Sequence, residues 1–215
     1  MEKVQIYYQD KNVVVCYKPK GYVSQEALQK NMLAALRAIC NTQDIYPVHR
    51  LDKQTDGIMV YAKNKKTAAD LSAQVTDGRF KKQYVVQTET PLLDNAAELQ
   101  DYLFWDKQKQ KAFVVKRMRK GVKEARLKYS SLADCVYLVA LYTGRTHQIR
   151  VQFASRRCPV VGDTKYGSKS KVPMRLFCCG LTFCLPGTDK QVKFVDVPSW
   201  AMEHLKKEMI FDGEI

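Results

Sequence analysis

The chain has 215 residues, 46% of them hydrophobic, and a formal net charge of +14 at pH 7. This length and this hydrophobic content are typical of a folded globule with a sizeable core, and they exclude a disordered tail. The sequence has no run of about 18 apolar residues and no apolar segment of the signal-peptide kind at its start. We therefore expect a cytoplasmic protein with no membrane partner.

The positive charge is concentrated in one stretch. Residues 107–128 contain seven lysines, three arginines and one glutamate, whereas residues 89–101 carry four acidic residues and no basic one. A basic stretch of this density predicts a nucleic-acid partner. The alternative interpretation is a lysine-rich surface that only favours solubility.

The seven cysteines and three histidines form no metal-binding pattern. There is no C-x-x-C pair, and the histidines are distant in sequence from the cysteines. We expect reduced, mostly buried thiols and no metal site.

The elements expected before residue 90 alternate between short β-rich runs and segments with apolar residues at helical spacing. They are, in order, strands at residues 4–8 and 12–17, a helix at 25–40, a strand at 58–62, a helix at 65–75 and a strand at 83–88. Ser24 is expected to cap the first helix, and Asp56-Gly57 to form a turn before the third strand.

The second half is richer in strands. The expected elements are strands at residues 103–105, 112–115, 126–130 and 135–142, a helix at 146–156, strands at 175–184 and 191–195, and a helix at 200–208. No repeat or linker is visible. We expect one α+β domain over residues 1–215, a mixed and largely antiparallel sheet flanked by helices.

Two polar segments stand out, about a hundred residues apart. The first is His49-Arg50-Leu51-Asp52-Lys53-Gln54-Thr55-Asp56-Gly57, and the second is Gly144-Arg145-Thr146-His147-Gln148-Ile149-Arg150. In the first, the carboxylate of Asp52 lies between two cations, which favour its charged form. This suits a nucleophile or base that acts on an uncharged group carried by a polyanion.

This pair of segments resembles the signature of the RluA-type pseudouridine synthases, which isomerise uridine in RNA. Three shorter matches follow the family's order: Lys18-Pro19-Lys20-Gly21, Lys82-Gln83-Tyr84 and Gly162-Asp163-Thr164-Lys165-Tyr166-Gly167. The resemblance implies the pseudouridine synthase fold and an isomerase that acts on a specific uridine in ribosomal or transfer RNA without cofactor or metal. Because the motifs begin so close to residue 1, we expect no N-terminal S4-type RNA-binding domain. We also expect a monomer.

The resemblance also implies roles for single residues. Asp52 would act at the ribose, either by attacking C1′ or by removing the C2′ proton. Arg150 would form a salt bridge with Asp52, with Arg145 as the alternative partner, and Tyr84 would stack on the flipped uracil. The residues expected to contact the RNA substrate are His49, Arg50, Arg145, His147 and Gln148.

The chain departs from the family pattern at two positions. Asp56 replaces a serine, and Gln152 replaces a histidine two residues after the motif arginine. Two other functions compete with isomerisation: a non-catalytic RNA-binding or folding factor that retains the fold, and a glycosidase that releases free uracil. The intact Asp52, Tyr84 and Arg150 argue against the first of these, because a protein that only binds RNA gains nothing from a carboxylate facing phosphates.

Overall fold

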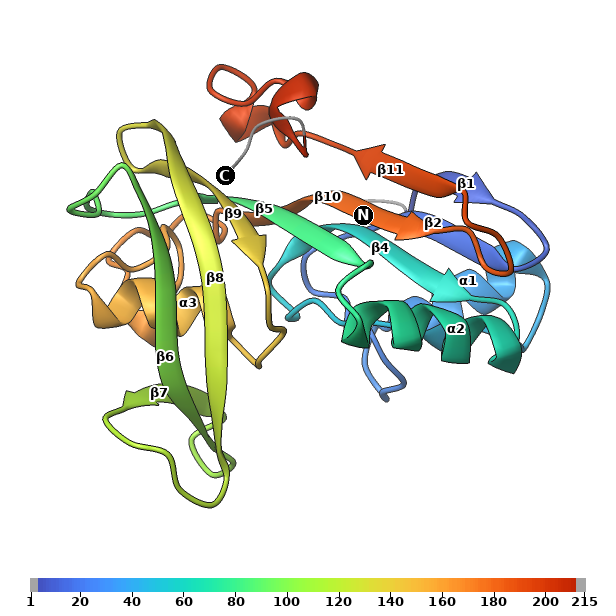
Figure 1. Ribbon diagram of the computed structural model, residues 1–215, viewed down its shortest axis with the longest axis horizontal. Coiled ribbons are helices and arrows are strands. Elements are labelled where there is room, and N and C mark those ends of the chain that lie inside the picture. The colour runs from blue at the N-terminus through green and yellow to red at the C-terminus, as the bar shows by residue number, and fades with distance from the viewer. Residues whose placement is uncertain (1–3, 212–215) are drawn as a thin grey trace. The chain divides into compact units, whose positions relative to one another are not determined.

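The computed structural model describes residues 4–211 and divides them into two compact units (Figure 1). Unit 1 contains the described residues up to Lys82 together with Phe177–Asp196, and unit 2 contains Gln83–Leu176 and the described residues from Val197 onward. The expectation of a single catalytic domain over residues 1–215 stays a prediction.

Unit 1 is built on strands in the order β1 (Ile6–Gln9), β2 (Val13–Lys18), β4 (Asp56–Ala62) and β10 (Leu176–Cys184). Two further strands join it: β3 (Tyr46–Pro47) pairs with β4, and β11 (Gln191–Val195) pairs with β10. β4 and β10 run parallel, and the other pairings between these strands are antiparallel. Every residue of β4 and of β10 is buried, which explains their nearly continuous apolar sequences.

Two helices belong to unit 1. The first, α1 (Met32–Cys40), begins later than expected, because Asn31 is its N-cap and accepts a hydrogen bond from the backbone N–H of Ala34. The prediction that Ser24 caps a helix over residues 25–40 was therefore wrong. The second helix, α2 (Lys65–Thr76), has Asn64 as its N-cap, and the prediction for residues 65–75 is confirmed.

Unit 2 is built on an antiparallel sheet with the strand order β5 (Lys81–Gln87), β9 (Val136–Leu141), β8 (Val122–Ala133), β6 (Ala96–Asp106) and β7 (Lys111–Val115). Helix α3 (Gln148–Ser155) packs against β6 and β7. An apolar cluster joins the helix to these strands, and it contains Leu103, Ala112, Ala125, Val151 and Tyr166.

The last expected helix is absent from its place. Residues 200–208 instead contain two short 3-10 turns, η2 (Ser199–Ala201) and η3 (Lys207–Met209). Only isolated side chains of this segment, such as Ala201 and Leu205, are buried, so no continuous apolar face holds a longer helix. The expected α+β class is confirmed, with mixed and largely antiparallel strands and helices packed against them.

The expected turn at Asp56-Gly57 was also wrong, because both residues are the first residues of β4. Gly57 has φ +125° and pairs with Cys178 of the parallel strand β10. A Cβ atom at this position would lie 2.4 Å from the carbonyl oxygen of Cys178 and 2.5 Å from its nitrogen. Only glycine allows the chain that follows Asp52 to pass this close to β10.

We predict that Gly57→Ala destabilises the protein by about 3 kcal/mol or more, because both backbones must move apart. Gly78→Ala is the matched control, since Gly78 also has a positive φ of +82° but has no atom within 4 Å of its hypothetical Cβ. The control should lose only about 1–2 kcal/mol from backbone strain. Urea unfolding of both variants checks this, and equal stability would contradict the close approach.

Candidate active site

Asp52 lies half-buried in the loop between β3 and β4, and backbone contacts hold both of its neighbours. On one side, the Ser24 hydroxyl donates to the Leu51 carbonyl at 2.8 Å and accepts from the Leu51 N–H at 3.0 Å. On the other side, the Gly21 N–H donates to the Lys53 carbonyl at 2.8 Å. Ser24 therefore positions the motif loop and does not cap a helix.

A buried ammonium group lies beneath this loop. Lys18 is fully buried, and its Nζ donates to the carbonyls of Pro19 at 3.1 Å, Tyr22 at 2.9 Å and Lys53 at 3.5 Å. Burial lowers the pKa of Lys18 to about 8, and the negative charges of Asp56 and Asp52 oppose this shift. Lys18 is thus a charged group close enough to Asp52 for the two to interact electrostatically.

Asp56, which replaces the serine of the family pattern, is buried in its own ion pair. Its carboxylate lies 3.1 Å from the Lys20 ammonium and accepts a hydrogen bond from the Tyr17 hydroxyl at 3.3 Å. Burial raises the pKa of Asp56, and the Lys20 charge opposes this rise. The additional carboxylate is therefore accommodated by local partners on β2 and the turn that follows it.

The two residues before Leu51 differ in their surroundings. His49 is 9% exposed, its Nε2 accepts a hydrogen bond from the Val60 N–H at 3.2 Å, and its ring lies 5.3 Å from that of Phe80. Burial lowers the pKa of His49 to about 3, so the imidazole is neutral. These contacts give His49 a structural role, whereas Arg50 is exposed. The RNA contacts expected of both residues stay predictions.

In unit 2, Arg150 projects from α3 into a buried ion pair. Its Nε and one terminal nitrogen donate to the two carboxylate oxygens of Asp163, at 2.6 and 2.9 Å. The two side chains are only 7% and 2% exposed. This two-point contact fixes the plane of the guanidinium group. The sequence did not predict Asp163 beside Arg150, and the expected salt bridge between Arg150 and Asp52 stays a prediction.

Tyr166 completes the surroundings of Arg150. The Arg150 guanidinium lies 5.0 Å from the centre of the Tyr166 ring, and the Tyr166 hydroxyl accepts a hydrogen bond from the Ala112 N–H at 2.7 Å. The hydroxyl also contacts Nδ1 of His147 at 2.9 Å. Asp163 and Tyr166 both come from the Gly162–Gly167 match, whose spacing was the available sequence signal for them.

The remaining residues of the second segment divide between interior and surface. Gln148 is buried, and its side chain accepts from the Thr143 hydroxyl at 2.7 Å and from the Arg145 N–H at 3.0 Å, and donates to the Arg126 carbonyl at 3.1 Å. These internal contacts hold the Gln148 side chain in place, and its expected RNA contact stays a prediction. Arg145 is exposed, and its Nε donates to the Glu124 carbonyl at 2.8 Å.

Tyr84 lies on β5 opposite Val139 and is 5% exposed. Asp52 thus belongs to unit 1, and Tyr84 and Arg150 belong to unit 2. Gln152, the second departure from the family pattern, is buried and donates to the Asp101 carboxylate at 2.8 Å. Its amide therefore has an internal partner.

Residues 4–211 contain no group of three or more His, Cys, Asp or Glu side chains placed to hold a metal ion. All seven cysteines are free thiols, and five of them are buried. None of the described helices has the length and apolar character needed to span a membrane.

Comparison with known proteins gives one consistent result. Residues 12–155 match the family model described as RNA pseudouridylate synthase. The ribosomal large subunit pseudouridine synthase D of Borreliella burgdorferi is 33% identical over 76% of this chain and 55% of its own length. An uncharacterized RNA pseudouridine synthase of Aquifex aeolicus is also 33% identical, over 80% of this chain and 59% of its own length. The chain thus spans less than two thirds of these relatives.

A solved structure has the same fold. The structure of human RNA pseudouridylate synthase domain containing 4 covers 91% of this chain and 89% of its own, with a TM-score of 0.73 and 22% sequence identity. At this identity the likeness bears on the fold alone, and it agrees with the expected pseudouridine synthase architecture.

We predict that His49 makes the protein less stable as the pH falls below about 6.5. The unfolded chain binds a proton on this imidazole near pH 6.5, whereas the folded chain does so only near pH 3, so acid favours unfolding between these values. The loss should reach about 1.4 kcal/mol at pH 5.5. His49→Gln, which keeps a hydrogen-bond acceptor, should remove this component from unfolding curves at pH 5.5 and 7.5. His204→Gln, at an exposed position, is the control, and identical pH dependence in both variants would contradict the prediction.

Proposed function

This chain belongs to the RNA pseudouridylate synthase family, of the RluA type, and we propose that it isomerises a specific uridine in RNA to pseudouridine. The observation that carries the proposal is the family match over residues 12–155, which includes Asp52, Tyr84 and Arg150. Relatives named ribosomal large subunit pseudouridine synthase D make ribosomal RNA the first substrate to test, ahead of transfer RNA.

The proposed reaction breaks the bond between N1 of uracil and C1′ of the ribose. The base then rotates, C5 bonds to C1′, C5 loses its proton and N1 gains one, so the reaction needs no oxidant or second substrate. Asp52 supplies the carboxylate, either as a nucleophile at C1′ or as a base at the C2′ proton. Its backbone is held by the contacts of Leu51 and Lys53, and the Lys53 carbonyl accepts from the buried Lys18 ammonium.

In this proposal, Tyr84 stacks on the displaced uracil, and Arg150 supplies positive charge to the reaction. The pairing with Asp163 gives Arg150 a fixed orientation before the substrate binds, which reduces the entropic cost of reaching the transition state. Arg50 and Arg145, both exposed, are the candidate phosphate contacts. The target uridine must leave its stack to reach Asp52, at a cost of a few kcal/mol that these contacts offset.

We predict that Asp52→Asn lowers the single-turnover rate of pseudouridine formation by about 1,000-fold or more, because an amide is neither a nucleophile nor a base. Asp44→Asn, at an exposed site of the same unit, is the matched control. The assay is mass-spectrometric detection of pseudouridine in ribosomal and transfer RNA. A rate within tenfold of the parent would remove Asp52 from the chemistry, release of free uracil would indicate a glycosidase, and RNA binding by the parent without any product would indicate a non-catalytic binder.

A second prediction separates Arg150 from Arg145. Removing Arg150 alone leaves the Asp163 carboxylate buried without its cation, which costs about 3–5 kcal/mol of stability. We therefore compare Arg150→Gln/Asp163→Asn with Asp163→Asn alone and with Arg145→Gln. The double variant should lose single-turnover rate at saturating RNA, whereas Arg145→Gln should mainly weaken RNA binding. If the rate falls only in Arg145→Gln, Arg145 takes the catalytic role.

A further inference from the structure

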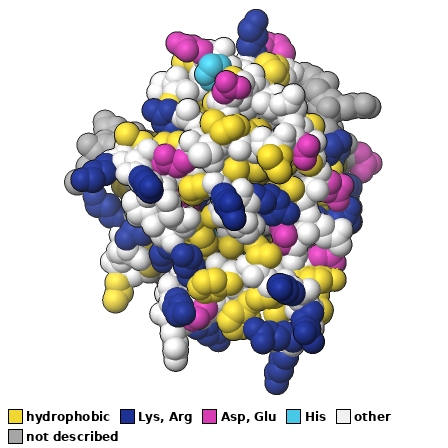
Figure 2. All heavy atoms as spheres, turned by 90° about the vertical axis from the view of Figure 1, so that its left-hand side faces the viewer, with side chains coloured by type: hydrophobic (Ala, Val, Ile, Leu, Met, Phe, Trp, Pro, Cys, Tyr) yellow, Lys and Arg dark blue, Asp and Glu magenta, His cyan; other side chains and the backbone are white. Residues whose placement is uncertain are grey.

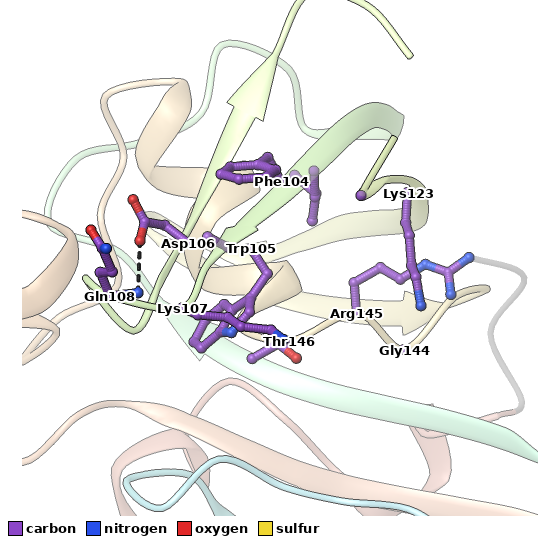
Figure 3. Close-up of a pocket in the computed structure, with 12 residues that line it drawn as sticks. Phe104, Trp105, Asp106, Lys107, Gln108, Lys123, Gly144, Arg145 and Thr146 are labelled. Atoms are coloured by element: carbon purple, nitrogen blue, oxygen red, sulfur yellow. Dashed lines mark hydrogen bonds between the residues drawn. The ribbon is translucent and has the colours of Figure 1, made fainter. Parts of the chain in front are cut away.

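Unit 2 contains a cavity of about 800 Å³ (Figure 3). It is lined by the end of β6 and the turn after it, by β7, by the start of β8 and by the loop before α3. Its volume lies within the range of roughly 300–1,000 Å³ that is common for sites that hold small organic groups. The lining residues that matter here are Trp105, Lys107, Lys123, Gly144, Arg145 and Thr146. Of these residues only Arg145 has a role assigned above, as a candidate phosphate contact.

Trp105 provides a fixed aromatic surface in the cavity. Its side chain packs against the apolar cluster beneath α3, and its ring meets that of His147 edge to face, at 5.1 Å and 88°. The indole is only half-buried, so part of it faces the cavity. Phe104, the preceding residue, also lines the cavity, but the guanidinium of Arg119 already lies 5.6 Å from the centre of its ring (Figure 3). Trp105 is therefore the lining ring that we assign to a ligand.

Two cations, Lys123 and Arg145, line the same cavity (Figure 3). In the described part of the chain neither forms an ion pair with a carboxylate. The hydrogen bond from Arg145 Nε to the Glu124 carbonyl fixes this side chain in place. Like charges that line one cavity repel each other, and an anion between them removes this cost.

The one acidic residue of the lining does not neutralise this pair. Oδ1 of Asp106 accepts hydrogen bonds from the backbone N–H groups of Gln108 and Lys109, both at 2.9 Å, and so stabilises the turn after β6. Lys107 adds a third positive charge near Trp105 (Figure 3). Figure 2 shows one face of the molecule, on which Lys and Arg side chains are interspersed with hydrophobic and acidic ones.

We propose that this cavity binds a second nucleotide of the RNA substrate, separate from the uridine that is isomerised. Its base stacks on Trp105, and its phosphate contacts Lys123 and Arg145. A nucleotide uses both features, because it carries an aromatic ring and an adjacent anion. This inference rests on the proposed function only in taking RNA as the substrate, and it adds a contact by which the protein selects its target RNA.

Tryptophan fluorescence tests the stacking directly. The chain has two tryptophans, Trp105 and Trp200, so Trp200→Phe leaves Trp105 as the only one. A single-stranded oligouridylate should quench the fluorescence of Trp200→Phe, because the stacked base contacts the indole. Inorganic polyphosphate, which offers only anions, should not. Equal quenching by both polymers, or no quenching by the oligouridylate, overturns the proposal.

Affinity measurements give an independent readout. Trp105→Leu, which keeps an apolar side chain against the cluster, should weaken oligouridylate binding on the order of tenfold, as expected for the loss of one stacked base. Lys123→Gln should lower the slope of log K against log salt by roughly 0.7, the value for one lost single-strand phosphate contact. Lys65→Gln/Lys66→Gln, at exposed positions on α2, is the charge control and should change the affinity less than twofold.

If Trp105→Leu does not fold, as judged by its thermal melting, Trp105→Phe replaces it, and the fluorescence titration of Trp200→Phe carries the test. Binding by Trp105→Leu within twofold of the parent overturns the proposal. None of these measurements requires turnover. A protein that forms no pseudouridine but shows quenching of Trp105 refutes the proposed function and leaves this site in place, whereas an active enzyme without quenching does the reverse.

Discussion

The ammonium group of Lys18 lies in the interior of unit 1, and its three backbone acceptors come from the turn after β2 and from the motif loop itself. A charge removed from water is costly unless fixed dipoles replace its hydration. These carbonyls can do so only while both loops keep their shape. The folded position of the chain around Asp52 and the solvation of Lys18 therefore depend on each other. The Ser24 contacts with Leu51 and the close approach of Gly57 to Cys178 restrain the same loop from two further sides.

The sequence predicted most of the strands and the helices α2 and α3, because apolar periodicity reports which face of an element is buried. The sequence-based prediction was wrong where a polar side chain could bond either to a nearby helix N-terminus or to a distant backbone group. Ser24 is a good helix cap, yet its hydroxyl bonds to Leu51, and Asn31 takes the capping role. Such a choice depends on a contact between residues far apart in the chain, which no local pattern records. The helix predicted over residues 200–208 was wrong for a related reason. The buried residues of this segment are isolated and do not form a continuous apolar face.

The candidate site shows the same division. The roles that the motifs predict for Asp52, Tyr84 and Arg150 stay predictions, and several neighbours expected to touch RNA have contacts inside the protein. His49 and Gln148 bond to the backbone of their own unit, and the Gly162–Gly167 match supplies Asp163 and Tyr166 around Arg150. Many of the motif residues therefore hold other polar groups of the protein in place. Sequence alone does not separate a residue that acts on a substrate from one that holds its neighbour.

The pairing of Arg150 with Asp163 has a consequence for which residue this position accepts. Both carboxylate oxygens are engaged by different nitrogens of one planar group, in a space that excludes water. A lysine would preserve the charge, but its ammonium is a compact group on a flexible chain. It cannot engage both carboxylate oxygens as the planar guanidinium does, and it has no flat face to lie over the Tyr166 ring. The interior of unit 2 thus discriminates by the shape of the cation as well as by its sign.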